Sequence, residues 1–162
     1  VKLPNGSTVH IATALAAAKN ITVATNAAEA VLTATGHGLA NGDFIVFTSG
    51  WGSATGLLFK VSVLNTYTFK LTGFDTSNVD KFPEGGGIGS FQKITAWQEI
   101  NQITEVTTSG GEQQFVDFGF LADDFDRQLP STKSAASLSI TIADDPTQAG
   151  YKAVAKASDA GG

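Results

Sequence analysis

The sequence predicts a mainly β protein: a sandwich or barrel-forming sheet with one flanking C-terminal α-helix, plus a small all-β insert domain. Three observations lead to this fold class. Apolar and hydroxyl residues alternate over Ser137–Ile142, as in a strand with one buried and one wet face. Turn signals recur about every eight to twelve residues between positions 20 and 92. The 162 residues include 18 glycines and only 15% charged residues, a composition typical of a β protein with many turns.

The first 19 residues are assigned to a core domain. Residues 8–13 are predicted to form a short strand. Residues 12–19 leave two conformations open, because their alanines favour a helix but the run is shorter than an isolated helix needs. The alternation of Ile11, Thr13 and Leu15 keeps an extended strand as the second possibility.

Residues 20–92 are predicted to form an inserted all-β module. It lies between the first and second strands of the core domain, which comprises residues 1–19 and 93–162. The strands of the module are expected at residues 21–24, 30–34, 44–47, 57–64 and 67–72. Asn41-Gly42 and Asn65-Thr66 provide turns, since Gly and Asn tolerate positive φ. The glycine-rich residues 82–89 are expected to return the chain to the core as a flexible rim.

The C-terminal part supplies the remaining elements of the core. Strands are predicted over residues 94–106, 114–120 and 137–142, with a turn at residues 109–112. The polar loop of residues 121–133 is far longer than a hairpin needs. A helix is predicted over residues 146–158. Asp145 can cap it, Pro146 suits its first position, and Gln148 sits where a capping box places its amide.

Composition excludes several classes of function. The formal net charge is −5, so nucleic acid is not an attractive binding partner on electrostatic grounds. The absence of cysteine removes disulfides, thiolate catalysis and Cys-ligated zinc. No segment approaches the roughly 20 apolar residues that cross a bilayer, so no membrane insertion of this chain is expected.

No catalytic, cofactor-binding or metal site is predicted. The glycines at 85–89 are not followed by the Lys-Ser or Lys-Thr of a phosphate-binding loop. Neither His10 nor His37 has an acidic residue at a helical metal-ligand spacing, and His37 is interpreted as the brace of a turn. No Gly-x-Ser-x-Gly elbow is present. We therefore expect that the protein is not an enzyme.

Several short segments, in this order, resemble the major tail tube protein of long, flexible-tailed (siphovirus-type) bacteriophages. They are WQEINQITEV at 97–106, GGE at 110–112, DDFDR at 123–127 with Leu129-Pro130, ASLSI at 136–140 and Asp145-Pro146. The middle of the chain is similar to small all-β modules of phage tail proteins, which share a fold with a β-domain of ubiquitin-activating enzymes. This second similarity rests on NITV at 20–23, ATGHGLANGDFIVF at 34–47 and YTFKL at 67–71. It implies a fold and no ubiquitin chemistry.

The first resemblance implies a structural subunit of the virion tail. In that family a curved sheet flanked by a helix closes into rings, hexameric ones among them, and the stacked rings form a hollow β-barrel conduit for DNA during genome ejection. Implied partners are further copies of the chain and the tape-measure, tail-tip and tail-terminator proteins, and DNA would pass without specific binding. Assembly would take place in the cytoplasm of the bacterial host. The family usually adds a strand after the helix, so the chain is expected to be C-terminally incomplete.

Two groups of residues are candidates for roles in such a tube. Residues 97–126 contain seven carboxylates and no Lys or Arg, and an acidic inner wall would repel phosphate. Glu99, Glu105 and Asp117 are the candidates for the lumen, with an ordinary solvated face as the alternative. An inter-ring role is expected for the long loop, with its apolar residues as anchors and its charges facing those of a neighbour; a divalent cation on its aspartates is the alternative. The candidate residues of the loop are Asp123, Asp124, Phe125, Asp126, Arg127 and Leu129.

Two other functions stay open. Trp51, on a glycine-rich loop, is the candidate exposed contact of the insert, and stacking on a sugar there would suit a carbohydrate-binding or adhesin module; the alternative is a lid over a small β core. A secretion-system or contractile-tail tube subunit is the other possibility. Such subunits are commonly compact, so the predicted insert counts against it.

Overall fold

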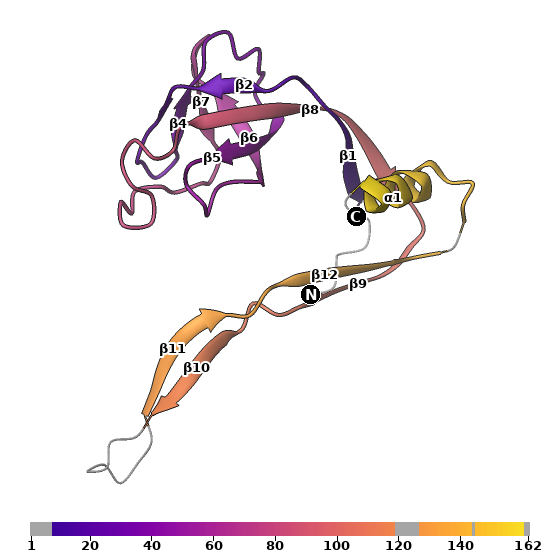
Figure 1. The fold of residues 1–162 in the computed structure, drawn as a ribbon. Helices are drawn as coiled ribbons and strands as arrows, with labels where there is room; N and C mark the ends of the chain where they lie inside the picture. The colour runs from indigo at the N-terminus through magenta and orange to yellow at the C-terminus, as the bar shows by residue number, and fades with distance from the viewer. Residues whose placement is uncertain (1–7, 119–126, 144, 161–162) are drawn as a thin grey trace. The chain divides into compact units, whose positions relative to one another are not determined.

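The computed structural model describes residues 8–118, 127–143 and 145–160, and the chain divides into two compact units (Figure 1). Residues 11–98 form what we call the barrel unit, and residues 1–10 with 99–162 form the ribbon unit. The fold is mainly β with one C-terminal helix, which confirms the predicted fold class. The first eight strands, of which the first and the last cross a boundary between the units, are β1 Val9–Leu15, β2 Lys19–Ile21, β3 Val23–Ala24, β4 Val31–Thr33, β5 Phe44–Ser49, β6 Leu57–Val63, β7 Thr68–Leu71 and β8 Gly89–Ile100. They are followed by β9 Ile103–Ser109, β10 Gln113–Phe118, β11 Arg127–Lys133, β12 Ser137–Ile142 and the helix α1 Ala149–Ala160.

The barrel unit is closed. Its antiparallel strands follow the order β8-β5-β6-β7-β4-β3, and β2, one residue before β3, pairs with β8. The strand formed by β2 and β3 therefore joins the last strand of the ladder to the first. Closure leaves no free edge in the ladder from β2 to β8, whereas β1, which also pairs with β8, stands at the end of the sheet. The strands predicted in residues 20–92 are confirmed, and β1 shows that the extended conformation of residues 12–15 is the correct one.

Side chains fill the barrel completely. The inward positions of its strands carry large apolar residues, among them Phe47, Phe69 and Phe91, which are at most 2% exposed. Two runs of aromatic contacts cross the interior. One joins Trp51, Phe82, Phe74, Phe59 and Phe47 ring to ring, and the other joins His37, Phe69 and Phe91. A barrel of this size has no room for a channel and is a packed core.

Trp51 closes this core at one side. Its ring is 2% exposed, and its Nε1 donates a hydrogen bond of 2.8 Å to the Pro83 carbonyl. The glycines opposite lie against the indole: a Cβ on Gly87 would lie 2.5 Å from Trp51 Cη2, and one on Gly86 would lie 3.2 Å from Nε1. Gly87 is buried. Glycine at positions 86 and 87 is therefore needed for close packing, and the flexibility expected of residues 82–89 stays a prediction.

Polar groups hold the turns around the barrel. The Lys19 ammonium donates hydrogen bonds to the Gly36 and His37 carbonyls at 2.6 and 3.1 Å. His37 is buried, and its Nδ1 accepts a 3.0 Å hydrogen bond from the Leu39 N–H. Its Nε2 lies 2.8 Å from the Asn65 carbonyl, so Nε2 carries the proton. This is the turn-bracing role predicted for His37.

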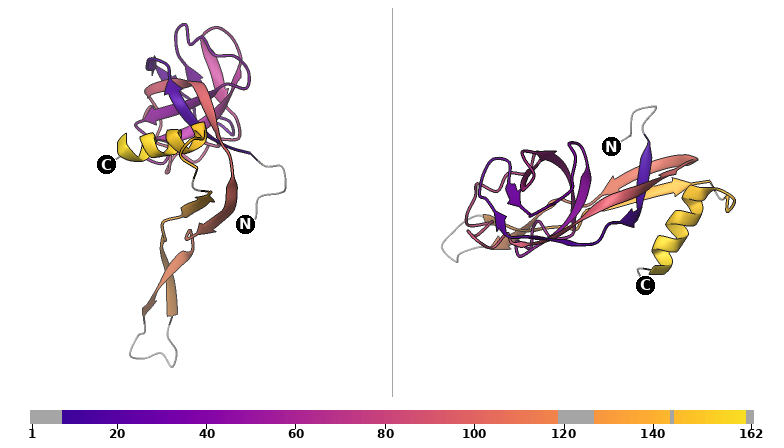
Figure 2. Two further views of the ribbon diagram at one scale, coloured as in Figure 1. Left: turned by 90° about the vertical axis from the view of Figure 1, so that its right-hand side faces the viewer. Right: turned by 90° about the horizontal axis from the view of Figure 1, so that it is seen from above.

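The ribbon unit is built differently. The strand predicted over residues 94–106 is interrupted: β8 ends at Ile100 and β9 begins at Ile103, because Gln102 has a φ of 59°. From there β9 pairs with β12 and β10 pairs with β11, both antiparallel. Together they form one long ribbon, two strands wide (Figure 2).

The helix α1 begins three residues later than predicted. The Asp145 carboxylate accepts hydrogen bonds from the N–H and hydroxyl of Thr147 and from the amide of Gln148, which organises a turn ahead of the helix. These bonds, those from Thr147 foremost, lower the pKa of Asp145. Gly150 is buried, and a Cβ there would lie 2.6 Å from the Glu99 carbonyl oxygen. The helix therefore approaches the end of β8 through a position that only glycine fits.

Candidate assembly surface

The half of the ribbon formed by β9 and β12 has two unlike faces. Directly paired residues share a face, so the register assigns each side chain. The apolar face carries Ile103, Val106, Leu138, Ile140 and Ile142. The opposite face carries only hydroxyl groups and one carboxylate, all of them exposed: Glu105, Thr107, Ser109, Ser137, Ser139 and Thr141. This ribbon therefore suits a position between a partner on one side and water on the other.

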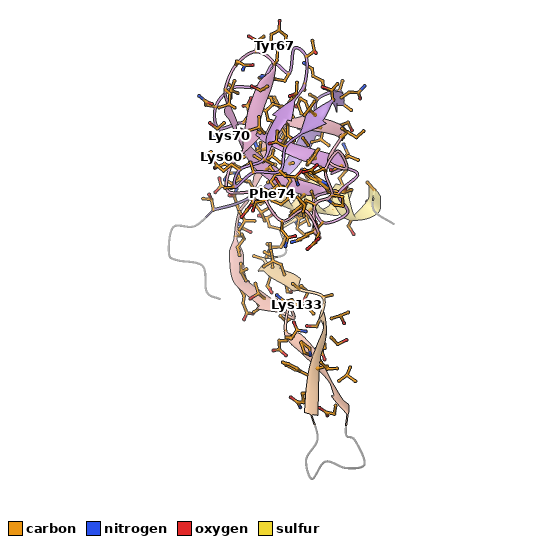
Figure 3. All side chains as sticks on the ribbon, turned by 90° about the vertical axis from the view of Figure 1, so that its left-hand side faces the viewer. Lys60, Tyr67, Lys70, Phe74 and Lys133 are labelled. Carbon is orange, nitrogen blue, oxygen red and sulfur yellow. The ribbon has the colours of Figure 1, made fainter. Side chains whose placement is uncertain are left out.

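The half formed by β10 and β11 carries apolar residues on both faces. Phe115 pairs with Pro130 on one face, and Val116 pairs with Leu129 on the other. Phe115, Val116 and Leu129 are each more than half exposed. Side chains project from both sides of the ribbon (Figure 3), and each of its described ladders has two strands. Apolar area on both faces is unusual for a surface exposed to water and marks an interaction site.

Every described strand of the ribbon also has one unpaired edge. The two ladders are each two-stranded, so β9, β10, β11 and β12 each have one row of N–H and C=O groups without a strand partner in the described part of the chain. Such edges are open to pairing with another chain. Isolated two-stranded ribbons are marginally stable at best, so this ribbon needs partners.

A glycine joint separates the two halves of the ribbon. Gly110 and Gly111 have φ values of 81° and 78°, a conformation that side chains disfavour. Opposite them, Ser134 N–H donates to the Glu112 carbonyl at 2.9 Å, and Glu112 N–H donates to Ser134 Oγ at 3.0 Å. A Cβ on Gly110 would collide with the Ala135 carbonyl oxygen. The turn predicted at residues 109–112 is therefore a joint within a continuous ribbon.

The candidate lumen residues lie on three different strands. Glu99 is exposed near the end of β8, Glu105 is on the hydroxyl face of β9, and Asp117 shares a face of the distal ribbon with Phe115. The register places Glu105 and Asp117 in separate ladders, and Glu99 belongs to neither. Of the three, Glu105 has the surroundings that best suit a wall in contact with water.

The candidate inter-ring residues are only partly described. Asp123, Asp124, Phe125 and Asp126 lie outside the described residues. Arg127 and Leu129 do not belong to a loop, because residues 127–133 form the strand β11. Sequence reasoning missed this strand because Pro130 and the polar neighbours masked it, although proline is compatible with an edge strand such as β11. It also missed the pairing of Val116 with Leu129. The alternation in residues 114–120 indicates the face of Val116 but not its partner.

The structure does not support the hypothesis that Trp51 is an exposed contact for a carbohydrate. Trp51 is buried beneath Gly86 and Gly87, so the expectation of an exposed Trp51 is wrong and the lid interpretation is correct. Among the residues that the structure describes, no three His, Asp or Glu side chains form a group that could hold a metal ion. No helix in the described ranges is long and apolar enough to cross a membrane.

Comparison with known protein families gives one match that includes this surface. A family model described as phage tail tube protein, TTP, matches residues 49–162. The match begins at the last residue of β5, so it covers β6, β7 and β8 and then the ribbon unit from residue 99 onward. The matched family is structural and is not an enzyme family. No curated protein matches the chain.

Proposed function

The chain belongs to the phage tail tube protein family, a family of self-assembling subunits of the virion tail, and from this we propose that it forms stacked rings enclosing a DNA conduit. The tube would be that of a siphovirus-type tail, and DNA would pass through it during genome ejection. Assembly would occur in the cytoplasm of the host, with the tape-measure, tail-tip and tail-terminator proteins as further partners.

One observation carries the proposal: in the described residues of the ribbon unit only Ile100 and Gly150 are buried, and the strands β9 to β12 have no buried apolar core. All residues of the buried apolar cluster belong to the barrel unit, while the apolar residues of the ribbon are half-buried or exposed. Closure into a ring would pair the open edges and cover the apolar face of β9 and β12. A barrel built from several subunits has too many strands for side chains to fill, so it encloses a channel.

The hydroxyl face of β9 and β12 is proposed as the wall of that channel. Hydroxyl groups present weak, neutral hydrogen-bonding partners, and Glu105 adds one carboxylate per subunit to this face. Phosphate contacts with Lys and Arg dominate nucleic-acid affinity, and this face has neither. DNA would slide along it without specific binding, with Glu99 and Asp117 as further acidic positions of the wall.

The distal half of the ribbon is proposed to reach the adjacent ring. It has two apolar faces, with Val116 and Leu129 on one and Phe115 on the other. Both faces are removed from water only when a partner covers each of them. Contacts to a neighbour in the same ring and to a subunit of the next ring would achieve this. Residues 123–126, beyond the end of β10, would extend the contact.

The part of the barrel unit formed by residues 20–92 is proposed as an inserted module that decorates the tube. The proposed tube core is residues 1–19 and 93–162, and residues 20–92 are the insert. The closed ladder of the barrel has no free edge to offer a neighbour, which is what an appendage outside the ring contacts requires.

Electron microscopy of the purified, concentrated chain tests the tube. We expect rings or hollow tubes with an open lumen. The adjacent residues Ile140 and Ser139, on opposite faces of β12, provide matched variants: Ile140→Glu places a charge on the apolar face and abolishes assembly, whereas Ser139→Glu adds a carboxylate to the channel wall and preserves it. A strictly monomeric wild-type chain at high concentration would contradict the proposal. Equal assembly of both variants would show that the apolar face of β9 and β12 is not an assembly contact, and assembly of Ile140→Glu but not of Ser139→Glu would reverse the assignment of the faces.

A further inference from the structure

The corner between β8 and β9 contains the one described residue other than glycine that has a positive φ. Gln102 has a φ of 59°, a left-handed conformation that suits glycine or asparagine better than glutamine. Two residues further on, the register of β9 with β12 shifts, so that Thr104 is an extra residue in β9. The sequence of residues 94–106 predicts instead that β8 runs on into β9. The corner is therefore bent against the local preference of its sequence.

The bend is held by the segment that follows β12. The Ala143 N–H donates a 3.0 Å hydrogen bond to the Gln102 carbonyl, and the Gln102 side chain hydrogen-bonds to the Asp145 carboxylate. The same carboxylate accepts hydrogen bonds from the N–H and hydroxyl of Thr147 and from the amide of Gln148, at 3.0, 2.6 and 3.2 Å. We call the hydrogen bonds on this carboxylate the Asp145 clasp. The clasp ties the corner to the turn ahead of α1.

The first turn of α1 contacts the backbone just before the corner. Gly150 is buried, and a Cβ there would lie 2.6 Å from the Glu99 carbonyl oxygen and 3.0 Å from the Ile100 Cα. The helix start therefore fits against this backbone with no room for a side chain. Because the bonds to Gln102 and the contact of Gly150 come from the same short segment, opening the corner and releasing the helix start are one movement.

We infer that the corner is a conformational switch: the Asp145 clasp and the contact of Gly150 hold residue 102 in the left-handed conformation, and their release lets β8 continue into β9 as one extended strand. A strained backbone persists only where its surroundings over-determine it, and such residues are found in switching elements. Disagreement between local sequence preference and the observed fold is expected at these elements. The inference concerns a single chain and does not rest on the proposed tube.

Removal of the clasp tests the switch in the full chain, kept dilute enough to be monomeric. Asp145→Ala removes the clasp, and Asp159→Ala, which removes an exposed carboxylate of α1, is the matched control. The backbone chemical shifts of Gln102 in NMR spectra report the sign of its φ. We expect Asp145→Ala to move these shifts toward extended values. The hydrogen-exchange rates of the Ala143 and Lys152 amides, which are bonded at the corner and in the first turn of α1, rise about fivefold or more. The control leaves both unchanged.

Substitution of the strained residue gives a second test. Gln102→Gly accepts a positive φ without strain, so adding it to Asp145→Ala is expected to restore slow exchange of the Ala143 amide. Gln102→Val carries a branched side chain that favours the extended conformation. It is expected to straighten the corner even with Asp145 in place.

The outcomes separate a switch from a simple helix cap. If Asp145→Ala loosens only the amides of α1 and leaves Gln102 at a positive φ, Asp145 is a helix cap and the inference is wrong. Equal exchange in Asp145→Ala with and without Gln102→Gly would show that the corner stores no strain. If Asp145→Ala fails to fold, Gln102→Val decides alone: a positive φ retained at wild-type stability would overturn the switch. None of these outcomes depends on whether tubes form.

Discussion

Packing around Trp51 shows what a single glycine contributes to the barrel. Gly87 faces the indole so closely that a Cβ would lie 2.5 Å from Trp51 Cη2 and 2.6 Å from the Ala24 Cβ. The sequence alone indicated a glycine-rich connector there. Composition cannot separate a mobile glycine run from a packed one, because the difference lies in the residue that packs against it, 36 positions away in the case of Trp51 and Gly87.

Gly87→Ala is expected to destabilise the barrel unit by about 1 to 3 kcal/mol, because the added methyl group overpacks the contact with Trp51. Gly52→Ala is the matched control, since a Cβ there meets no atom within 4 Å. Urea unfolding followed by tryptophan fluorescence measures both. Equal stability of the two variants would show that the indole can move aside without cost.

Asp43 gives the barrel unit a dependence on pH. Burial raises the pKa of Asp43, but the hydrogen bond from Ala40 N–H and the hydrogen bond and charge of Lys93 together outweigh burial and lower it below its ordinary value of 3.8. A carboxyl with a lowered folded pKa contributes its stability fully above the ordinary value and loses it as pH falls through the folded value.

We therefore expect the unfolding free energy to fall below about pH 4, with Asp43 supplying about 1 kcal/mol of the loss, as for a partly exposed ion pair. Asp43→Asn lowers stability at pH 7 and flattens this part of the pH profile. Asp80→Asn, which removes one carboxylate from an exposed loop, is the control. Thermal unfolding monitored by circular dichroism from pH 7 to pH 2 is the measurement. An unchanged pH profile of stability in Asp43→Asn would show that Asp43 does not contribute to the pH dependence.

At the scale of elements, strands with clear alternation were predictable and those without it were not. The alternation in Ser137–Ile142 gave the strand β12 and its two faces from sequence alone. The sequence of β11 predicts a loop, because Pro130 and its polar neighbours have no period of two, and only the pairing with β10 makes it a strand. Edge strands with proline lack the sequence signal because they are built to discourage wrong pairing.

Gly110 and Gly111 offer a test of the ribbon joint. Both have positive φ, so alanine at either position is strained by about 1 kcal/mol. Gly110→Ala is expected to do more damage, because its Cβ would meet the Ala135 carbonyl, whereas the Cβ of Gly111→Ala meets only the Ala136 Cβ at 3.9 Å. Hydrogen exchange of the amides in β9 and β12 reports the loss. Equal exchange in both variants would show that φ strain alone sets the cost.

At the scale of the whole molecule, the hydroxyl face of β9 and β12 predicts that the proposed tubes do not bind DNA. Glu105→Lys places one cation per subunit on this face, which creates a phosphate contact where none existed. Assembled tubes of this variant are expected to retain DNA at low salt and to release it as salt rises, while Glu105→Gln retains none. Co-sedimentation of short duplexes with the tubes measures it. Equal behaviour of both variants would place Glu105 away from the channel.

The family was predictable from the sequence, whereas the arrangement of its surfaces was not. The segments at 97–106 and 136–140 lie in the matched range. The alternation in residues 137–142 is visible in the sequence, but its partners depend on the register that sets Ile140 opposite Val106. Registers arise from pairing between distant segments, and a turn shifted by one residue would move every side chain to the other face.

The pairing of β2 with β8 has a consequence beyond stability. Lys19 lies directly opposite Phe91, so the chain enters and leaves the barrel at neighbouring backbone positions. A segment whose two ends touch can be gained, lost or exchanged in one recombination event without moving the strands that flank it.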